Sequence, residues 1–151
     1  MQKITTFLWY DNQAEDAATL YTSIFKNSRI LSTFRPGGGP VLTVTFEIDG
    51  QQFIALNGGP KYKFTEATSL YVSCETQAEV DDYWSKLTAD GGSESMCGWL
   101  KDKFGLSWQI IPTALTRCLS NPDPKKAKAV MDAMLKMRKI VIADLEAAGQ
   151  A

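Results

Sequence analysis

The first third of the chain passes from an alternating pattern of apolar residues to a helical one and back again. Residues 3–10 (KITTFLWY) are β-branched and aromatic, which is typical of a strand, whereas residues 13–25 space their apolar side chains like one face of a helix. Asp49-Gly50 is a strong hairpin signal. The pattern predicts a strand, a helix and three strands, in the order β-α-β-β-β, over residues 3–10, 13–25, 28–34, 41–48 and 51–56.

The same order of elements is predicted a second time, after a break of glycine and proline near residue 60. This second set is a strand, a helix, a short extended piece and a hairpin over residues 69–74, 76–89, 93–97 and 97–112. We therefore describe one repeat over residues 3–57 and another over 69–112. Two half-sheets that each bury one face on a helix should combine into a single curved, mostly antiparallel sheet with a central cleft. The expected fold class is α+β.

Both predicted helices have N-terminal cap signals. Asp11 or Asn12 is expected to cap the first helix, and Glu75 or Thr76 the second, with Glu79 in the capping-box position. Such side chains satisfy backbone N–H groups that have no partner within the first turn of a helix. The caps therefore support the two helix predictions independently of periodicity.

The hairpin over residues 97–112 (CGWLKDKFGLSWQIIP) is predicted to turn at Gly105, because glycine takes a positive φ at little cost. Trp99 and Trp108 are expected to meet across it as an aromatic pair. Gln109 is a polar amide in an otherwise apolar strand, so it is either a satisfied amide of the sheet or a residue that faces a cavity. Alternation places Leu106, Trp108 and Ile110 on one face of the last strand and Ser107, Gln109 and Ile111 on the other.

The remainder of the chain, residues 113–151, is predicted to be a C-terminal helical extension. A proline-rich break at residues 120–124 separates a short helix from the helices that follow, and methionines lie on one side of the second. The predicted helices cover residues 113–119, 125–138 and 139–148. We treat residues 1–151 as a single domain that contains the two repeats and this extension.

Composition narrows the possible functions. The chain has 151 residues, a net charge of −1 and no histidine, which removes a Ser–His–Asp triad, a Cys–His pair and a histidine-based zinc motif. The near-neutral charge argues against nucleic acid as a partner, and no apolar run is long enough to span a bilayer. The three cysteines are widely spaced and are expected to be buried free thiols, and without a secretion signal the expected location is cytoplasmic.

Four segments are characteristic beyond their secondary structure: ITTFLWYDNQAEDAATLYTSIF, IDGQQFIALNGGP, SLYVSCETQAEVDDYW and GWLKDKFGLSWQIIPTAL. Through them the chain resembles the vicinal-oxygen-chelate superfamily, which includes glyoxalase I, bleomycin-resistance proteins and extradiol dioxygenases. More closely it resembles the PhnB-like branch, often catalogued as demethylubiquinone methyltransferase-like, and the run DPKKAKAVMDAMLKMRKI is similar to the C-terminal extension of that branch. The resemblance implies a fold of two βαβββ repeats around a cleft.

In metal-dependent relatives, each repeat contributes one metal ligand from its first strand and one from its last. The resemblance places these positions at Thr6 and at Asn57 or a neighbour in repeat one, and at Ser69 or its neighbour and Gln109 in repeat two. None of the four is His, Asp or Glu, and neutral side chains compensate poorly for the dehydration of a divalent ion. We therefore expect a preserved cleft with no metal and no cofactor.

The function that follows is the binding of a small molecule in the cleft, with or without catalysis. Thr6, Asn57, Ser69 and Gln109 would supply polar contacts, and the apolar walls would come from Trp9, Trp99 and Trp108 together with Phe7. Asp102 or Glu47 could act as a general base. The alternatives are a structural or regulatory homodimer with a vestigial cleft, and a metal-dependent lyase or dioxygenase. A homodimer is expected in each case, whereas the Gly-rich turn of a methyltransferase is missing.

Overall fold

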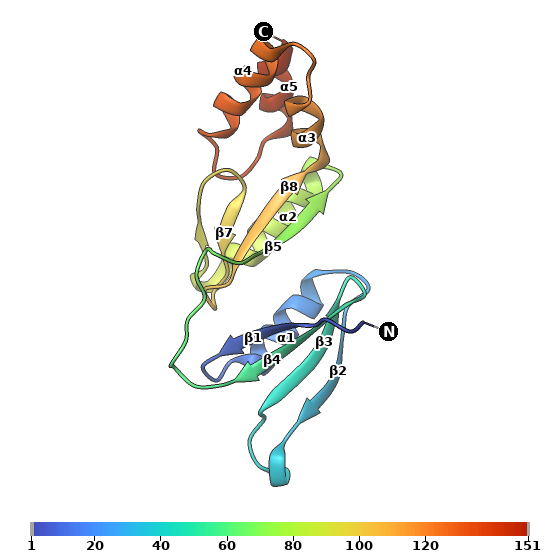
Figure 1. The fold of residues 1–151 in the computed structure, drawn as a ribbon, viewed down its shortest axis with the longest axis vertical. Helices are drawn as coiled ribbons and strands as arrows, with labels where there is room; N and C mark the ends of the chain where they lie inside the picture. Colours follow the sequence, from blue (N-terminus) through green and yellow to red (C-terminus); the bar gives the residue numbers. More distant parts are fainter. Residues whose placement is uncertain (1, 151) are drawn as a thin grey trace. The chain divides into compact units, whose positions relative to one another are not determined.

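The computed structural model describes residues 2–150 and divides between Phe64 and Thr65 into two compact units. Unit 1 is Met1–Phe64 and contains the first repeat; unit 2 is Thr65–Ala151 and contains the second repeat and the C-terminal helices. In each unit a helix lies against one face of its own sheet (Figure 1). The strands hydrogen-bond as two four-stranded sheets, one per repeat, rather than as one continuous sheet.

Unit 1 has the predicted order of elements. They are β1 (Thr6–Tyr10), α1 (Ala14–Ile24), β2 (Arg29–Phe34), a short 3-10 turn η1 (Pro36–Gly38), β3 (Thr43–Ile48) and β4 (Gln51–Asn57). The strands lie in the order β1-β4-β3-β2, with β1 parallel to β4 and the other pairs antiparallel. The Asp49-Gly50 turn joins β3 to β4, and both of its residues have positive φ, as such a two-residue hairpin requires.

Unit 2 repeats this topology. Its elements are β5 (Ser69–Cys74), α2 (Gln77–Thr88), η2 (Ala89–Gly91), β6 (Ser93–Glu94), β7 (Trp99–Lys101), β8 (Ser107–Pro112), α3 (Thr113–Leu119), α4 (Pro124–Met134) and α5 (Ile142–Gln150). The strand order is β5-β8-β7-β6, again with one parallel pair, β5 with β8. The predicted α+β class, with two βαβββ repeats, mostly antiparallel pairing and C-terminal helices, is confirmed.

The core of unit 1 lies between α1 and the sheet. Alternate residues of β3 are buried, namely Val44, Phe46 and Ile48, and α1 buries Ala17, Ala18 and Tyr21 against them. The hydroxyl groups of Tyr10 and Tyr21 are 3.1 Å apart in this interior. A buried pair of tyrosines needs such a contact, because an unpaired hydroxyl in an apolar core is costly.

The two repeats cap their helices differently, and one cap prediction is wrong. In α2, Thr76 Oγ1 accepts from the Glu79 N–H at 3.2 Å and Glu79 Oε1 accepts from the Glu75 N–H at 2.9 Å, which confirms Thr76 as the cap and the role of Glu79. In α1, neither Asp11 nor Asn12 caps: Gln13 holds the cap position without a side-chain bond. A side chain from β4 replaces them.

The C-terminal helices belong to unit 2. Their core consists of Ile111, Leu115, Val130, Ile140 and Leu145. The Gln77 amide in α2 donates to Ile140 O at 3.0 Å and accepts from the Ile142 N–H at 2.7 Å, so one side chain binds both sides of the turn before α5. Gly98 has φ +84°, and an added Cβ there would lie 2.7 Å from Ile111 Cδ1, so this position requires glycine.

Candidate functional site

Strand register places each predicted site residue on one of two faces of its sheet. Directly paired residues share a face, so Glu94, Leu100 and Trp108 lie together in unit 2. The Trp84 indole N–H of α2 donates to Glu94 Oε1 at 2.6 Å, which makes this the face that α2 covers. We call the opposite side the distal face of unit 2. Its residues include Ser69, Tyr71, Trp99, Lys101, Ser107 and Gln109, and Ser73 and Ile111 continue it toward the C-terminal helices.

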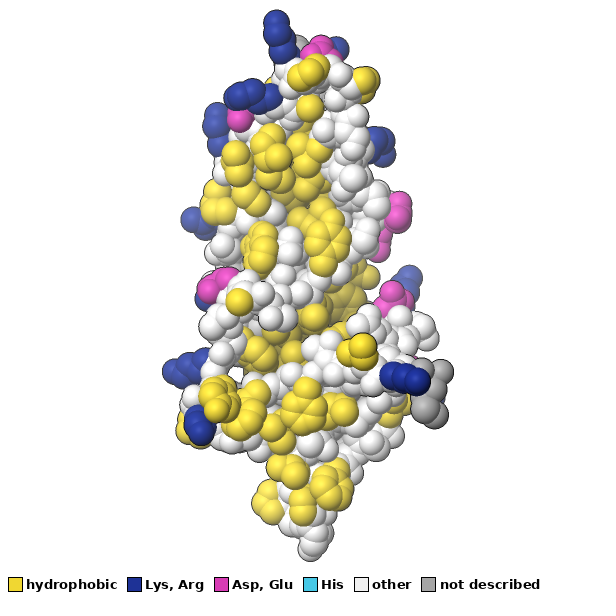
Figure 2. Space-filling model, viewed as in Figure 1, with side chains coloured by type: hydrophobic (Ala, Val, Ile, Leu, Met, Phe, Trp, Pro, Cys, Tyr) yellow, Lys and Arg dark blue, Asp and Glu magenta, His cyan; other side chains and the backbone are white. Residues whose placement is uncertain are grey.

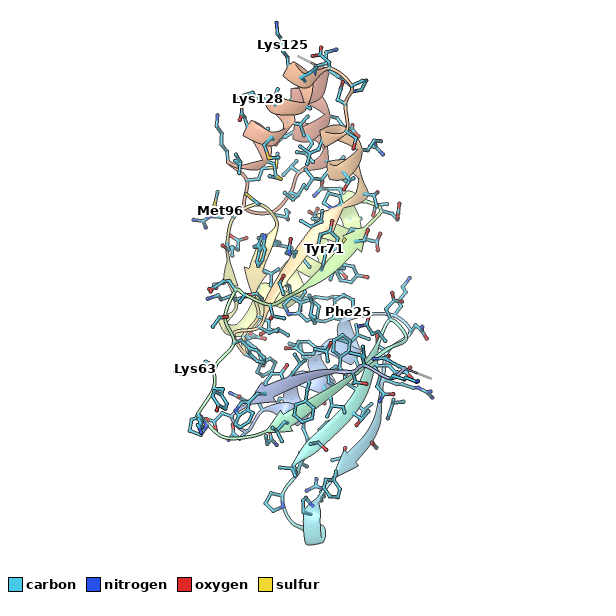
Figure 3. The ribbon with its side chains drawn as sticks, in the orientation of Figure 1. Phe25, Lys63, Tyr71, Met96, Lys125 and Lys128 are labelled. Atoms are coloured by element: carbon cyan, nitrogen blue, oxygen red, sulfur yellow. The ribbon has the colours of Figure 1, made fainter. Side chains whose placement is uncertain are left out.

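Gln109 lies at the centre of the distal face of unit 2. It is paired with Tyr71 of β5 on one side and Trp99 of β7 on the other, and its Nε2 donates to Ser69 Oγ at 3.0 Å. Tyr71, labelled in Figure 3, is 57% exposed, and Trp99 is half-buried. The structure therefore brings three of the predicted residues together, as an amide and a hydroxyl between two aromatic rings. It also shows Tyr71 as a fourth member that the sequence analysis did not select.

A second row of polar residues crosses the distal face beside Gln109. Ser69, Ser107 and Lys101 are consecutive neighbours across β5, β8 and β7. Ser107 is 1% exposed, and its hydroxyl has no hydrogen-bond partner among residues 2–150. Lys101 forms an ion pair with Glu66, and the hydrogen bond from Lys101 holds the pKa of the Glu66 carboxyl below its usual value. Sequence reasoning missed Ser107, because serine in a strand carries no signal of being buried.

Thr6 and Asn57, the positions chosen in unit 1, lie on the face that α1 covers. Thr6 alternates with the buried Leu8 and Tyr10. Asn57 uses both ends of its amide within the fold: Oδ1 accepts from the Ala14 N–H at 2.8 Å, and Nδ2 donates to Val41 O at 3.1 Å. Asn57 is thus the missing cap of α1, supplied from β4. These bonds give Asn57 a structural role, because each end of its amide is held by the backbone of the fold.

The position of unit 1 that corresponds to Gln109 is Ile54. Ile54 is paired with Phe7 of β1 and Thr45 of β3, as Gln109 is paired with Tyr71 and Trp99 in unit 2. On the face of this sheet opposite α1, which we call the distal face of unit 1, the central position is therefore the apolar Ile54, where unit 2 has the polar Gln109. Thr6 and Asn57, which the resemblance indicated as ligand positions, therefore lie on the opposite face of the sheet from Ile54.

Trp9 lies on the distal face of unit 1 and is held by the loop after β4. Its indole N–H donates to Gly59 O at 2.8 Å, and its ring meets the Tyr62 ring edge-on at 4.9 Å between centroids. A Cβ on Gly58 would lie 2.4 Å from the Trp9 ring, so only glycine permits this contact. Tyr62 therefore covers Trp9, and Phe64 packs on Tyr10 with centroids 5.2 Å apart.

Trp108 is a core residue, and its predicted pairing with Trp99 is wrong. The register pairs Trp99 with Gln109 and Leu100 with Trp108, which puts the two tryptophans on opposite faces. Trp108 is 1% exposed. The five-residue turn between β7 and β8 sets this register, whereas the prediction assumed a turn that would bring the rings onto one face.

Asp102 organises that turn. It is 2% exposed, its Oδ2 accepts from the Trp108 indole N–H at 2.9 Å, and its Oδ1 accepts from the backbone N–H groups of Phe104 and Leu106 at 2.9 and 3.1 Å. Asp102 is thus not supported as a general base, because its carboxylate is enclosed and used in the fold. An acidic side chain that bonds the backbone two residues on is a known turn device, and this signal was available in the sequence DKFG.

Glu47 and the three cysteines, the other candidate reactive groups, form no catalytic arrangement within residues 2–150. Glu47, the other candidate base, forms an ion pair with Arg29 at 3.6 Å on β2. The three cysteines are free, and Cys74 is fully buried. Burial, together with the charges of Glu79 and Glu75, raises the pKa of the Cys74 thiol to about 12, which makes it a poor nucleophile near neutral pH.

Known proteins with this fold define its class. The PhnB protein from Bacillus cereus is 38% identical, covers 74% of this chain and 100% of its own, and superposes with a TM-score of 0.67. Two further structures share the fold. A Pseudomonas aeruginosa protein is 16% identical, with 74% of this chain and 98% of that protein covered and a TM-score of 0.62. The fosfomycin resistance protein FosX from Listeria monocytogenes is 16% identical, with 74% of this chain and 93% of FosX covered and a TM-score of 0.53. The fold is that of the vicinal-oxygen-chelate superfamily, as the sequence indicated.

The family within that superfamily follows from a match over residues 2–111 to the model described as 3-demethylubiquinone-9 3-methyltransferase. The chain belongs to this family, the PhnB-like branch of the superfamily. No curated protein matches the chain. None of the helices described between residues 2 and 150 is long and apolar enough to cross a bilayer.

The residues at the expected ligand positions do not fit a divalent metal ion. They are the neutral Thr6 and Asn57 in unit 1 and the neutral Ser69 and Gln109 in unit 2, and the amide of Asn57 already bonds Ala14 and Val41. Across residues 2–150, no group of three His, Cys, Asp or Glu side chains is arranged to hold an ion. Hard cations such as Mn²⁺ or Fe²⁺ need carboxylate or imidazole ligands, so we derive no metal-assisted step for this chain.

Proposed function

We propose that this protein binds a small organic molecule on the distal face of unit 2 without a catalytic metal of its own. The observation that carries the proposal is the position of Gln109, which lies between Tyr71 and Trp99 and is hydrogen-bonded to Ser69. Small-molecule sites are largely aromatic or apolar, with a few polar groups that orient the ligand. These four residues have that character.

The screen that tests the proposal measures thermal unfolding of the wild type with a metabolite library and with divalent metals. A ligand at 100 times its Kd stabilises a protein by about 2.7 kcal/mol, which is readily measured. We expect organic ligands that raise the melting temperature of the wild type and of Q51A but not of Q109A. Gln51 is an exposed glutamine of β4 in unit 1 and serves as the matched control. Silence across the library, or equal shifts in Q109A, would contradict the proposal.

The metal-dependent alternative is tested separately. Elemental analysis of the purified protein measures bound Fe, Mn, Ni and Zn. We expect substoichiometric amounts, because neutral amide and hydroxyl ligands hold divalent ions weakly. A stoichiometric metal that is lost in Q109A would show that the lyase or dioxygenase hypothesis is the better one.

A homodimer is the second part of the proposal, and exposed apolar residues support it. Phe7 and Phe34 of unit 1 are 53% and 55% exposed, and all of β2 lies at the surface. Figure 2 shows hydrophobic side chains at the surface of the molecule, and such surfaces commonly mark protein contacts. Light scattering after gel filtration should give a dimer for the wild type and for I4S, a control at another exposed position, and a monomer for F7S/F34S. A monomeric wild type would overturn this part.

We place the protein in the cytoplasm, which its three free cysteines favour.

A further inference from the structure

An unsatisfied hydroxyl identifies a second, more specific feature of the distal face of unit 2. Ser107 Oγ is enclosed and lacks a hydrogen-bond partner within residues 2–150. Buried polar atoms nearly always have a partner, and one that does not is costly to the folded state. Alanine would fill the same place in β8 without that cost. The hydroxyl is therefore better explained by a partner that the free protein does not contain.

The neighbours of Ser107 supply further hydrogen-bond donors on the same face. Ser69 lies beside it on β5, with an Oγ that accepts from Gln109 and keeps its own proton to donate. Lys101 lies beside it on β7 and carries the positive charge of the row. Neighbouring side chains on one sheet face have Cβ atoms about 5 Å apart, so one small anionic group can reach more than one of them.

The chain itself places an anion against this row. The Glu66 carboxylate pairs with the Lys101 ammonium group. The side chains of Lys101 and Glu66 are 40% and 62% exposed, and an exposed ion pair contributes little to stability. Glu66 can therefore leave Lys101 at small cost when another carboxylate takes its place.

We propose that Ser107, Ser69 and Lys101 form a subsite for a ligand carboxylate, and that Glu66 competes for its Lys101 end in the free protein without reaching Ser107. The subsite rests on the proposed function, because it would bind one end of the molecule that Gln109, Tyr71 and Trp99 hold. It assigns that molecule to the organic acids. The hydroxyl of Ser107 gains its missing acceptor when the ligand binds, so the site trades stability of the free protein for affinity.

The test uses succinate as the probe, at constant ionic strength, with chloride and inorganic phosphate as comparison anions. Thermal unfolding and Trp fluorescence are measured for the wild type, S107A, K101M, E66Q and S73A. Ser73 is an exposed serine of β5 and is the matched control for Ser107. We expect succinate to stabilise the wild type and S73A, to stabilise E66Q at several-fold lower concentration because the internal competitor is gone, and to have no effect on S107A or K101M.

Stability of the free protein provides a second, independent readout. Removing an unsatisfied buried hydroxyl should raise the melting temperature of S107A by about 2–4 °C without any ligand, whereas S73A should leave it unchanged. A melting temperature that falls in S107A, weaker succinate binding in E66Q, or an equal response to phosphate would overturn the carboxylate subsite. If metabolites still bind in a Gln109-dependent way while carboxylates have no effect on either the wild type or E66Q, this inference fails and the proposed function stands.

Discussion

The two repeats share a topology but differ in how each completes its helix and its distal face. In unit 1, Asn57 at the end of β4 caps α1, and Pro112 stands at the corresponding position of β8 in unit 2. In unit 2, α2 carries its own capping box around Thr76. The central row of the distal face is Phe7, Ile54 and Thr45 in unit 1, and Tyr71, Gln109 and Trp99 in unit 2.

This difference agrees with the proposed division of roles between the repeats, with association in unit 1 and ligand binding in unit 2. A polar side chain at the end of the last strand is used for the fold in unit 1, and the polar side chains of the distal face remain available in unit 2. Unit 1 instead exposes apolar surface, which suits association, and unit 2 presents hydrogen-bonding groups, which suit recognition of a ligand. The predictions below test this division.

The largest effect is expected at the hairpin turns. D102A removes a buried carboxylate that accepts three hydrogen bonds, so it should lower the free energy of unfolding by about 3 kcal/mol. The turn of unit 1 depends on backbone conformation instead: Asp49 has φ +49° and is exposed. D49G should therefore change stability by less than about 0.5 kcal/mol. Urea unfolding measures both, and similar losses in the two variants would refute the contrast.

The helix caps come next. N57A should cost about 2 kcal/mol, because it leaves the Ala14 N–H and the Val41 carbonyl without their partner. T76A should cost about 1 kcal/mol, since a local cap on an exposed helix end is replaced by water. Hydrogen exchange should show faster exchange at the Ala14 amide in N57A only. A larger loss in T76A than in N57A would mean that α1 does not depend on β4.

Replacing Gln109 by isoleucine, the residue at the equivalent position 54 of unit 1, is expected to have a smaller effect on stability and a large effect on binding. Q109I should change the free energy of unfolding by less than about 1 kcal/mol, because isoleucine occupies the topologically equivalent position 54, where one neighbour is also aromatic. It should abolish the ligand-induced thermal shift. A Q109I variant that unfolds or that still binds would show that the amide serves the sheet rather than a ligand.

The smallest effect concerns thiol chemistry. Because the pKa of Cys74 is raised to about 12, its thiol stays protonated at pH 8–9, and labelling by a disulfide reagent should be far slower than at Cys97 and Cys118, which are half-buried. The unfolded thiol ionises at lower pH than the folded one, so the stability from this group is present below about pH 9 and is lost as pH rises toward 12. C74A should remove this part of the alkaline slope. Equal labelling of all three thiols would contradict the burial.

Much of the fold could be predicted from local patterns. Alternation identified the strands and the faces of β8, and helical spacing identified α1 and α2, because burial of one face imposes these periods. Element ends were less accurate: β1 begins at Thr6 rather than at residue 3, and α4 ends at Met134 rather than at 138. Periodicity alone does not locate the last hydrogen bond of an element.

The parts that could not be predicted depend on residues far apart in the chain. The cap of α1 comes from Asn57, 43 residues from Ala14, and no local signal connects them. Trp99 and Trp108 were paired wrongly because hairpin register depends on the conformation of the whole turn. Three of the seven predicted ligand residues, Ser69, Gln109 and Trp99, share the distal face of unit 2. Alternation along β8 placed Gln109 on the correct face, although the predicted pairing of Trp99 with Trp108 was wrong.

The C-terminal extension bears on the shape of any ligand. Ile111 follows Gln109 on the same side of β8, and it is buried among side chains of the three terminal helices. The family match ends at residue 111, so these helices lie outside the matched region, and they cover the distal face of unit 2 at Ile111. A molecule bound as we propose would not extend past Gln109 toward Ile111, and its longer dimension would run the other way, toward Ser69 and Lys101.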